Sequence, residues 1–312
     1  MNGHPEQSPI EVLLPAFDEA PYRLAPERES ELRTLVRERN IQFKLDRETL
    51  AMRFEGVNLF DMIGPIYIGV RGLERLWVFA YAATHVYMRF QANGFTRPLL
   101  LPATPEGRVV DALLRWAVEG EAKDNPAPWP ADLPKPQLNP VDDVHLVANE
   151  LFWGAGGFAV LHEIGHVIRR HGGMDQPRDV LFREEFEADE WAYDWVMDRW
   201  RDYSPNPLVH KKRTTLLASL FALIAIGEIH DPERVKEGKH PNIIDRTLRF
   251  LIKHANESSG LPDGLAWAVS ATTIHLHLTH MTNETLPSVE SFRDYFNLIR
   301  NRVGLQEESE TE

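Results

Sequence analysis

Residues 161–171 read L-H-E-I-G-H-V-I-R-R-H and contain the pattern H-E-x-x-H. Residues four apart lie on one face of an α-helix, so His162 and His166 can direct both imidazoles at one metal ion. Glu163 lies at the edge of that face, where it can reach a water molecule that the metal activates. Two histidine ligands and a general base in this spacing are typical of zinc hydrolases. The pattern therefore requires a helix here and a third ligand from elsewhere in the chain.

The third ligand must be a histidine or a carboxylate, because the chain contains no cysteine. Residues 183–190 read R-E-E-F-E-A-D-E, and in a helix Glu185 and Asp189 share a face. Glycines at 172–173 predict a turn, and the small Ala188 permits close approach, so an antiparallel helix pair can return Glu185 to the histidines. We predict Glu185 as the third ligand, with Asp189 accepting the second N–H of a ligand histidine. The alternatives for the third ligand are Glu184, Glu187, Glu190 and Asp189.

Residues 239–246 read K-H-P-N-I-I-D-R and offer two further site candidates. An isolated His-Pro is usually a surface loop. Beside a metallopeptidase site, however, His240 can supply a cation for the oxyanion, and Arg246 can pair with Asp189 or Glu187. The histidines at 275, 277 and 280 do not share one helical face, so we predict no second metal site there.

The periodicities predict an α+β, mainly helical fold of zincin-like type, in which a small N-terminal sheet precedes a helical bundle that carries the metal site. Four regions follow from this reading: an α+β region at 1–125, a proline-rich connector at 126–140, a helical metallopeptidase region at 141–305 and an acidic disordered tail at 306–312. The predicted strands are 41–45 and 51–55, joined as a hairpin, and 66–70. The predicted helices are 26–39, 73–90, 108–119, 142–171, 179–200, 208–230, 242–255, 264–281 and 289–303.

Four small residues at 154–157, G-A-G-G, interrupt the predicted helix before the metal motif. Each glycine costs a helix roughly 1 kcal/mol relative to alanine. Two explanations fit: close packing against a neighbouring segment, or a break after which the active-site helix begins near Phe158. Gly165 lies inside the motif itself, where it permits a neighbouring backbone to approach.

Charge and hydropathy limit the partners of the chain. The formal net charge of -13 argues against nucleic acid or an anionic membrane as the main partner. The N-terminus shows no signal-peptide pattern, and the apolar run at 214–226 is shorter than the roughly 20 residues that a membrane span needs. A buried core helix is favoured there over an interfacial one. With no cysteine, the expected location is the cytoplasm.

The order H-E-x-x-H, then E-x-x-A-D, then H-P-x-x-x-x-R resembles the gluzincin metallopeptidases, particularly those related to the CAAX prenyl-protease and heat-shock membrane peptidases. That resemblance implies zinc bound by His162, His166 and Glu185, with Glu163 as the base. Those relatives are polytopic membrane proteins, and this chain lacks their spans.

A closer resemblance, to the phage-exclusion Lit peptidases of bacteria, covers most of the chain. The matching stretches are 21–36 (P-Y-R-L-A-P-E-R-E-S-E-L-R-T-L-V), 73–79 (L-E-R-L-W-V-F), 113–117 (L-L-R-W-A), 129–136 (W-P-A-D-L-P-K-P), 183–189 (R-E-E-F-E-A-D), the metal motif with H-V-I-R-R-H, and K-H-P. The resemblance implies a cytoplasmic zinc endopeptidase of anti-phage defence, one that cleaves elongation factor Tu when a phage-derived activator is present.

The residues by themselves favour hydrolysis of a protein substrate with zinc as cofactor. The main alternative is a partner-binding regulatory or sensor protein whose zinc site is structural or vestigial. A non-peptide zinc hydrolase is a weaker alternative, since the chemistry needs only a polarised carbonyl. The sequence has neither G-x-S-x-G nor a Walker-type phosphate loop.

Overall fold

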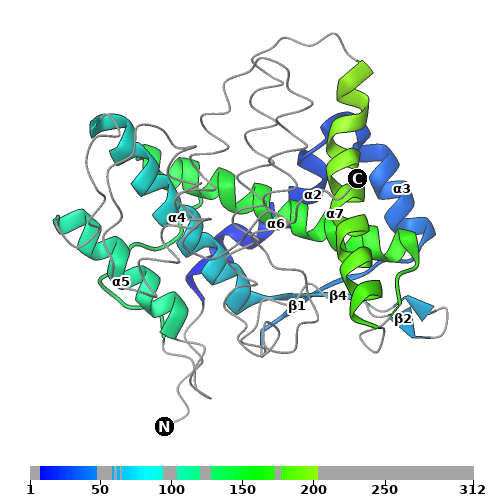
Figure 1. The fold of residues 1–312 in the computed structure, drawn as a ribbon. Helices are drawn as coiled ribbons and strands as arrows, with labels where there is room; N and C mark the ends of the chain where they lie inside the picture. Colours follow the sequence, from blue (N-terminus) through cyan, green and yellow to red (C-terminus); the bar gives the residue numbers. More distant parts are fainter. Residues whose placement is uncertain are drawn as a thin grey trace, which may run out of the picture.

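The structure, a computed structural model, describes residues 8–47, 58–59, 62–63, 65–93, 104–119, 128–172 and 177–202. Within them the fold is mainly helical with two small sheets, so the predicted α+β class is confirmed (Figure 1). The elements are η1 Pro9–Leu13, α1 Leu14–Phe17, α2 Ala20–Arg23, η2 Pro26–Arg28, α3 Glu29–Glu38, β1 Phe43–Asp46, β2 Asn58–Leu59, β3 Met62–Ile63, β4 Ile66–Gly69, α4 Val70–Asn93, α5 Pro105–Glu119, α6 Asp143–Arg169 and α7 Arg178–Asp202.

Helix α6 lies at the centre of the fold, and most of its length is buried. It begins where the Asp142 side chain accepts a hydrogen bond from the His145 backbone N–H at 2.9 Å, a typical N-cap. It is packed against α4 and α7. One polar contact joins α4 to α6 inside the core: the Trp77 indole N–H donates to Oδ1 of Asn149 at 2.8 Å. The burial of α6 explains its apolar sequence, and the metal motif lies within this buried helix.

The glycines of α6 are explained by close packing, because the helix continues unbroken through them. A Cβ on Gly156 would collide with the ring of Phe17. A Cβ on Gly157 would lie 2.8 Å from the carbonyl carbon of Ala20, closer than real Cβ atoms come. Because these two positions have no side chain, the N-terminal segment can pack directly against the helix that holds the site.

The N-terminal segment also holds α7. The guanidinium of Arg28 stacks over the Trp195 ring, 3.5 Å from its centroid, and donates to the Trp195 carbonyl oxygen at 3.0 Å. The segment therefore contacts both helices that supply the site.

The predicted first and third strands are present as β1 and β4, which pair in parallel with Phe43 opposite Ile66. Ile66 and Ile68 are buried, and β4 continues directly into α4. Strands β2 and β3 form a second, antiparallel pair. The strand predicted at 51–55, with its hairpin, lies outside the described residues.

The helices predicted at 26–39, 73–90, 108–119, 142–171 and 179–200 are confirmed as α3, α4, α5, α6 and α7. Those predicted beyond residue 202, including the apolar run at 214–226, lie outside the described residues. Among the described helices, α6 is long and apolar enough to cross a membrane. However, 72% of its most apolar 18-residue window is buried by the rest of the fold, as in the core helix of a globular domain.

Candidate metal centre

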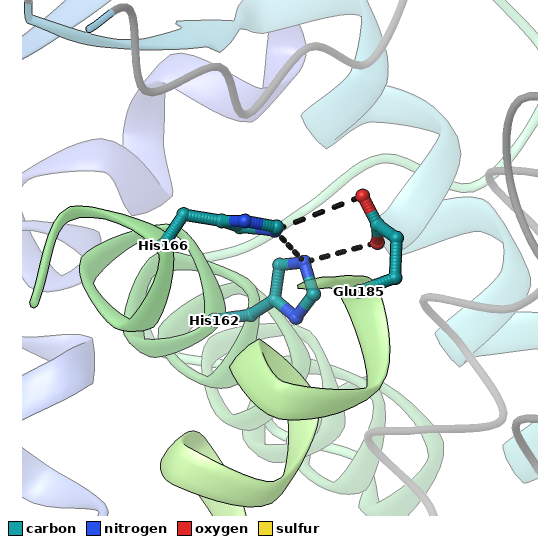
Figure 2. A group of neighbouring side chains, drawn as sticks. All are labelled: His162, His166 and Glu185. Carbon is teal, nitrogen blue, oxygen red and sulfur yellow. Dashed lines mark hydrogen bonds and ion pairs between the residues drawn. The ribbon is translucent and has the colours of Figure 1, made fainter. Parts of the chain in front are cut away.

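The candidate metal centre forms where α7 crosses the C-terminal part of α6 (Figure 1). Gly165 permits this contact: a Cβ there would lie 3.1 Å from the Ala188 carbonyl oxygen. The small residues that the sequence places at these two positions thus meet at the helix crossing. His162 and His166 come from α6 and Glu185 from α7, and Figure 2 shows the three side chains directed toward one another.

The donor atoms of these three residues converge on one point. The Nε2 atoms of His162 and His166 lie 3.0 Å apart. Oε2 of Glu185 lies 3.4 Å from Nε2 of His162, and Oε1 lies 3.7 Å from Nε2 of His166. A tetrahedral zinc ion with bonds of about 2.0–2.1 Å separates its ligand atoms by about 3.3 Å. The three residues therefore fit a metal ion of zinc's size and ligand preference, and they could hold one.

The carboxylate side chains of α7 contact different partners. Oδ1 of Asp189, which is 1% exposed, lies 2.8 Å from Nδ1 of His162. Glu184 accepts a hydrogen bond from the Gly172 backbone N–H at 3.1 Å, and Oε2 of Glu187 lies 3.1 Å from Nε2 of His171. Glu190 is exposed to solvent. Of the alternatives that the sequence leaves open, Glu185 is the carboxylate placed beside both Nε2 atoms.

Glu163 lies next to His162 on α6 and is 9% exposed. The sequence-predicted candidates His240 and Arg246 lie outside the described residues. In the part of the chain that the structure describes, the carboxylates predicted to pair with Arg246 contact histidines: Asp189 is near His162, and Glu187 is near His171.

Sequence reasoning did not identify His171 as part of the site. Its Nδ1 lies 2.8 Å from Nδ1 of His166, so it contacts the nitrogen that faces away from the donor cluster. The available signal is its position five residues after His166, just past the helix end. Five residues along a continuous helix would direct the side chain to another face, so the contact depends on the turn at Arg170.

The two α6 histidines are electrostatically coupled. Burial alone would lower the pKa of His162, but the carboxylates of Asp189 and Glu185 outweigh it and raise that pKa to about 10. Burial and the positive charge on His162 lower the pKa of His166 to about 3. These opposite pKa shifts favour a single positive charge on the pair, carried by His162, and the Nε2 atoms of the two rings lie 3.0 Å apart.

Zinc binding at pH 7 is expected to release about one proton, because the Nε2 that binds the ion must first lose its hydrogen. Since the pKa of His162 is raised to about 10, the group is protonated below that pH, and apparent affinity should rise by about tenfold per pH unit between pH 7 and 9. Calorimetric titration in two buffers of different ionisation enthalpy measures the released proton. Identical binding heats in the two buffers, both chosen because they bind zinc weakly, would contradict this assignment of charge.

Comparison with known proteins gives two matches. The sequence profile of the family described as Peptidase U49 matches residues 66–270, a range that contains α4 to α7 and all three donor residues. The protein named "Cell death peptidase" of Escherichia coli (strain K12) is 28% identical over 232 residues, which cover 72% of this chain and 75% of that protein. No solved structure shows a significant match.

Proposed function

Because this chain belongs to the Lit peptidases, family U49, its activity is peptide-bond hydrolysis, and we propose that it is a zinc-dependent endopeptidase. The observation that carries the zinc assignment is the convergence of the donor atoms of His162, His166 and Glu185. The ligand order H-E-x-x-H followed by E-x-x-A-D supports a gluzincin-type site within a zincin-like fold.

The donor set suits zinc among the common metals. Two imidazoles and one carboxylate, with no thiolate in the chain, leave one tetrahedral position free, as in catalytic zinc sites. When bound, zinc supplies Lewis acidity, which polarises the scissile carbonyl and increases the acidity of the attacking water. Asp189, whose Oδ1 lies 2.8 Å from Nδ1 of His162, would hold that ring in the orientation that directs Nε2 toward His166 and Glu185.

Glu163 is the proposed general base. Its carboxylate takes the proton of the attacking water and then delivers that proton to the leaving amine. We assign His240 as a cation that stabilises the oxyanion and Arg246 as a partner of Asp189 or Glu187; both assignments rest on the sequence pattern.

The proposed setting is bacterial anti-phage defence in the cytoplasm. The resemblance to the phage-exclusion peptidases supports elongation factor Tu as the protein substrate and a phage-derived activator as the trigger. The net charge of -13 disfavours nucleic acid as a partner.

A comparison of wild type with Glu163→Gln in bacterial extract, with and without phage proteins, tests the proposal. New N-termini that appear only with wild type establish the peptidase and identify the substrate by mass spectrometry. Equal N-termini in both samples, together with partner binding by both proteins, would instead support a sensor with a structural zinc site.

A further inference from the structure

His171 is the first residue after the turn that ends α6. Arg170 adopts the left-handed backbone conformation, with φ 57 and ψ 44, and caps the C-terminal end of the helix. The backbone N–H of His171 then donates to the His166 carbonyl oxygen at 3.1 Å. The side chain of His171 is buried, with the residue 7% exposed. Its backbone and its ring therefore both contact His166.

The hydrogen bonds of the His171 ring determine which nitrogens carry hydrogen. The Nδ1 atoms of His171 and His166 lie 2.8 Å apart, so one of them donates and the other accepts. On its other side, Nε2 of His171 lies 3.1 Å from Oε2 of Glu187. An ionised carboxylate only accepts, so a neutral His171 carries its hydrogen on Nε2 and accepts at Nδ1. His166 must then donate from Nδ1.

This assignment leaves the lone pair of His166 on Nε2, the atom that faces His162 and Glu185. We propose that His171 is a positioning residue of the metal centre, and that together with Glu187 it fixes the tautomer and the ring orientation of His166. The identity of the ion rests on the proposed function, whereas the hydrogen-bonded chain from Glu187 through His171 to His166 is independent of any bound ion.

The two ligand histidines are thereby held in different ways. His162 contacts the buried carboxylate of Asp189 directly. His166 reaches a carboxylate only through a second imidazole, and the Glu187 side chain at the end of that chain is 40% exposed. A ligand histidine with an outer partner gains basicity and loses rotational freedom, and removal of such a partner typically lowers metal affinity about 10–100-fold.

The test measures zinc dissociation constants of the full-length protein by competition with a chromophoric chelator. His171→Leu removes the acceptor for His166 and is expected to weaken zinc binding about 10–100-fold. His171→Asn returns an acceptor oxygen near the position of Nδ1 and is expected to recover part of that loss. Glu187→Gln should weaken binding by a smaller factor. The matched control is Glu190→Gln, which makes the same charge change at an exposed position on the same helix and should bind zinc like wild type.

A second readout uses the metal-free protein. Nitrogen-15 spectra of the histidine rings should show hydrogen on Nδ1 of His166 and on Nε2 of His171.

If His171 had only a structural role, His171→Leu would have a lower melting temperature but unchanged zinc affinity. That result would overturn the proposal, as would hydrogen on Nε2 instead of Nδ1 in His166. If His171→Leu fails to fold, Glu187→Gln and the ring spectra decide the matter. A wild type that binds no zinc would refute the proposed function, while the spectra would still test the hydrogen-bonded chain.

Discussion

Replacing Glu163 by glutamine is expected to lower the cleavage rate about 10²–10⁴-fold, the usual contribution of a general acid–base group. Glutamine has nearly the same shape but cannot take a proton from water at neutral pH. The donor cluster of His162, His166 and Glu185 remains, so the variant should still bind one zinc ion per chain. Initial rates on the identified substrate and metal analysis of the same preparations measure both effects.

The matched control for this variant is Glu150→Gln, since Glu150 lies on the same helix but is exposed. The control should cleave at the wild-type rate. An unchanged rate in Glu163→Gln would refute the role of Glu163 as base. Loss of zinc together with activity would show that Glu163 supports the metal site itself.

Replacing Glu185 by alanine is expected to weaken zinc binding by more than the roughly 100-fold that loss of an outer partner costs. The substitution removes the carboxylate 3.4 Å from Nε2 of His162 and 3.7 Å from Nε2 of His166, which leaves two protein ligands. Cleavage should be lost at limiting zinc. Chelator competition and cleavage assays across a zinc series measure both effects.

Glu190→Ala is the control for Glu185→Ala, because it removes an exposed carboxylate from the same helix. It should retain the wild-type zinc affinity. If Glu185→Ala retained that affinity as well, the third ligand would have to come from another residue, and the geometric argument for Glu185 would fail.

The helices of the site could be predicted because their patterns are local. His162 and His166 are one helical turn apart, and the glycine and alanine at the helix crossing mark where two backbones can meet. The position of Glu185 beside the histidines was expected from the turn predicted at the glycines 172–173 and from the small Ala188. These features require no knowledge of the remaining fold.

The role of His171 could not be predicted from periodicity, because it depends on one backbone conformation. Arg170 adopts positive φ, which is uncommon for a residue other than glycine, and the sequence marks the turn with the glycines that follow it. The parallel pairing of β1 with β4 could not be predicted from periodicity either. Parallel strands are connected through a long stretch of chain, so no local pattern shows which two strands pair.

Residues 21–36, one of the stretches that resemble the Lit peptidases, make contacts near the site helices. Arg28 stacks on Trp195 of α7, and Arg33 lies over the Tyr22 ring at 3.9 Å. Ala20, just before this stretch, meets α6 at Gly157, and Arg28 within it meets α7 at Trp195, so this part of the chain packs against both helices that supply the site.

Whether one zinc ion at this site performs peptide hydrolysis is tested by a zinc titration of the metal-free wild-type protein. Cleavage and zinc occupancy are followed in the same samples, with circular dichroism as the measure of folding. We expect activity to rise in proportion to occupancy and to saturate at one zinc per chain, while the protein is folded throughout. Cleavage by the fully metal-free protein, or zinc binding that restores folding without restoring cleavage, would contradict the assignment of catalysis to zinc.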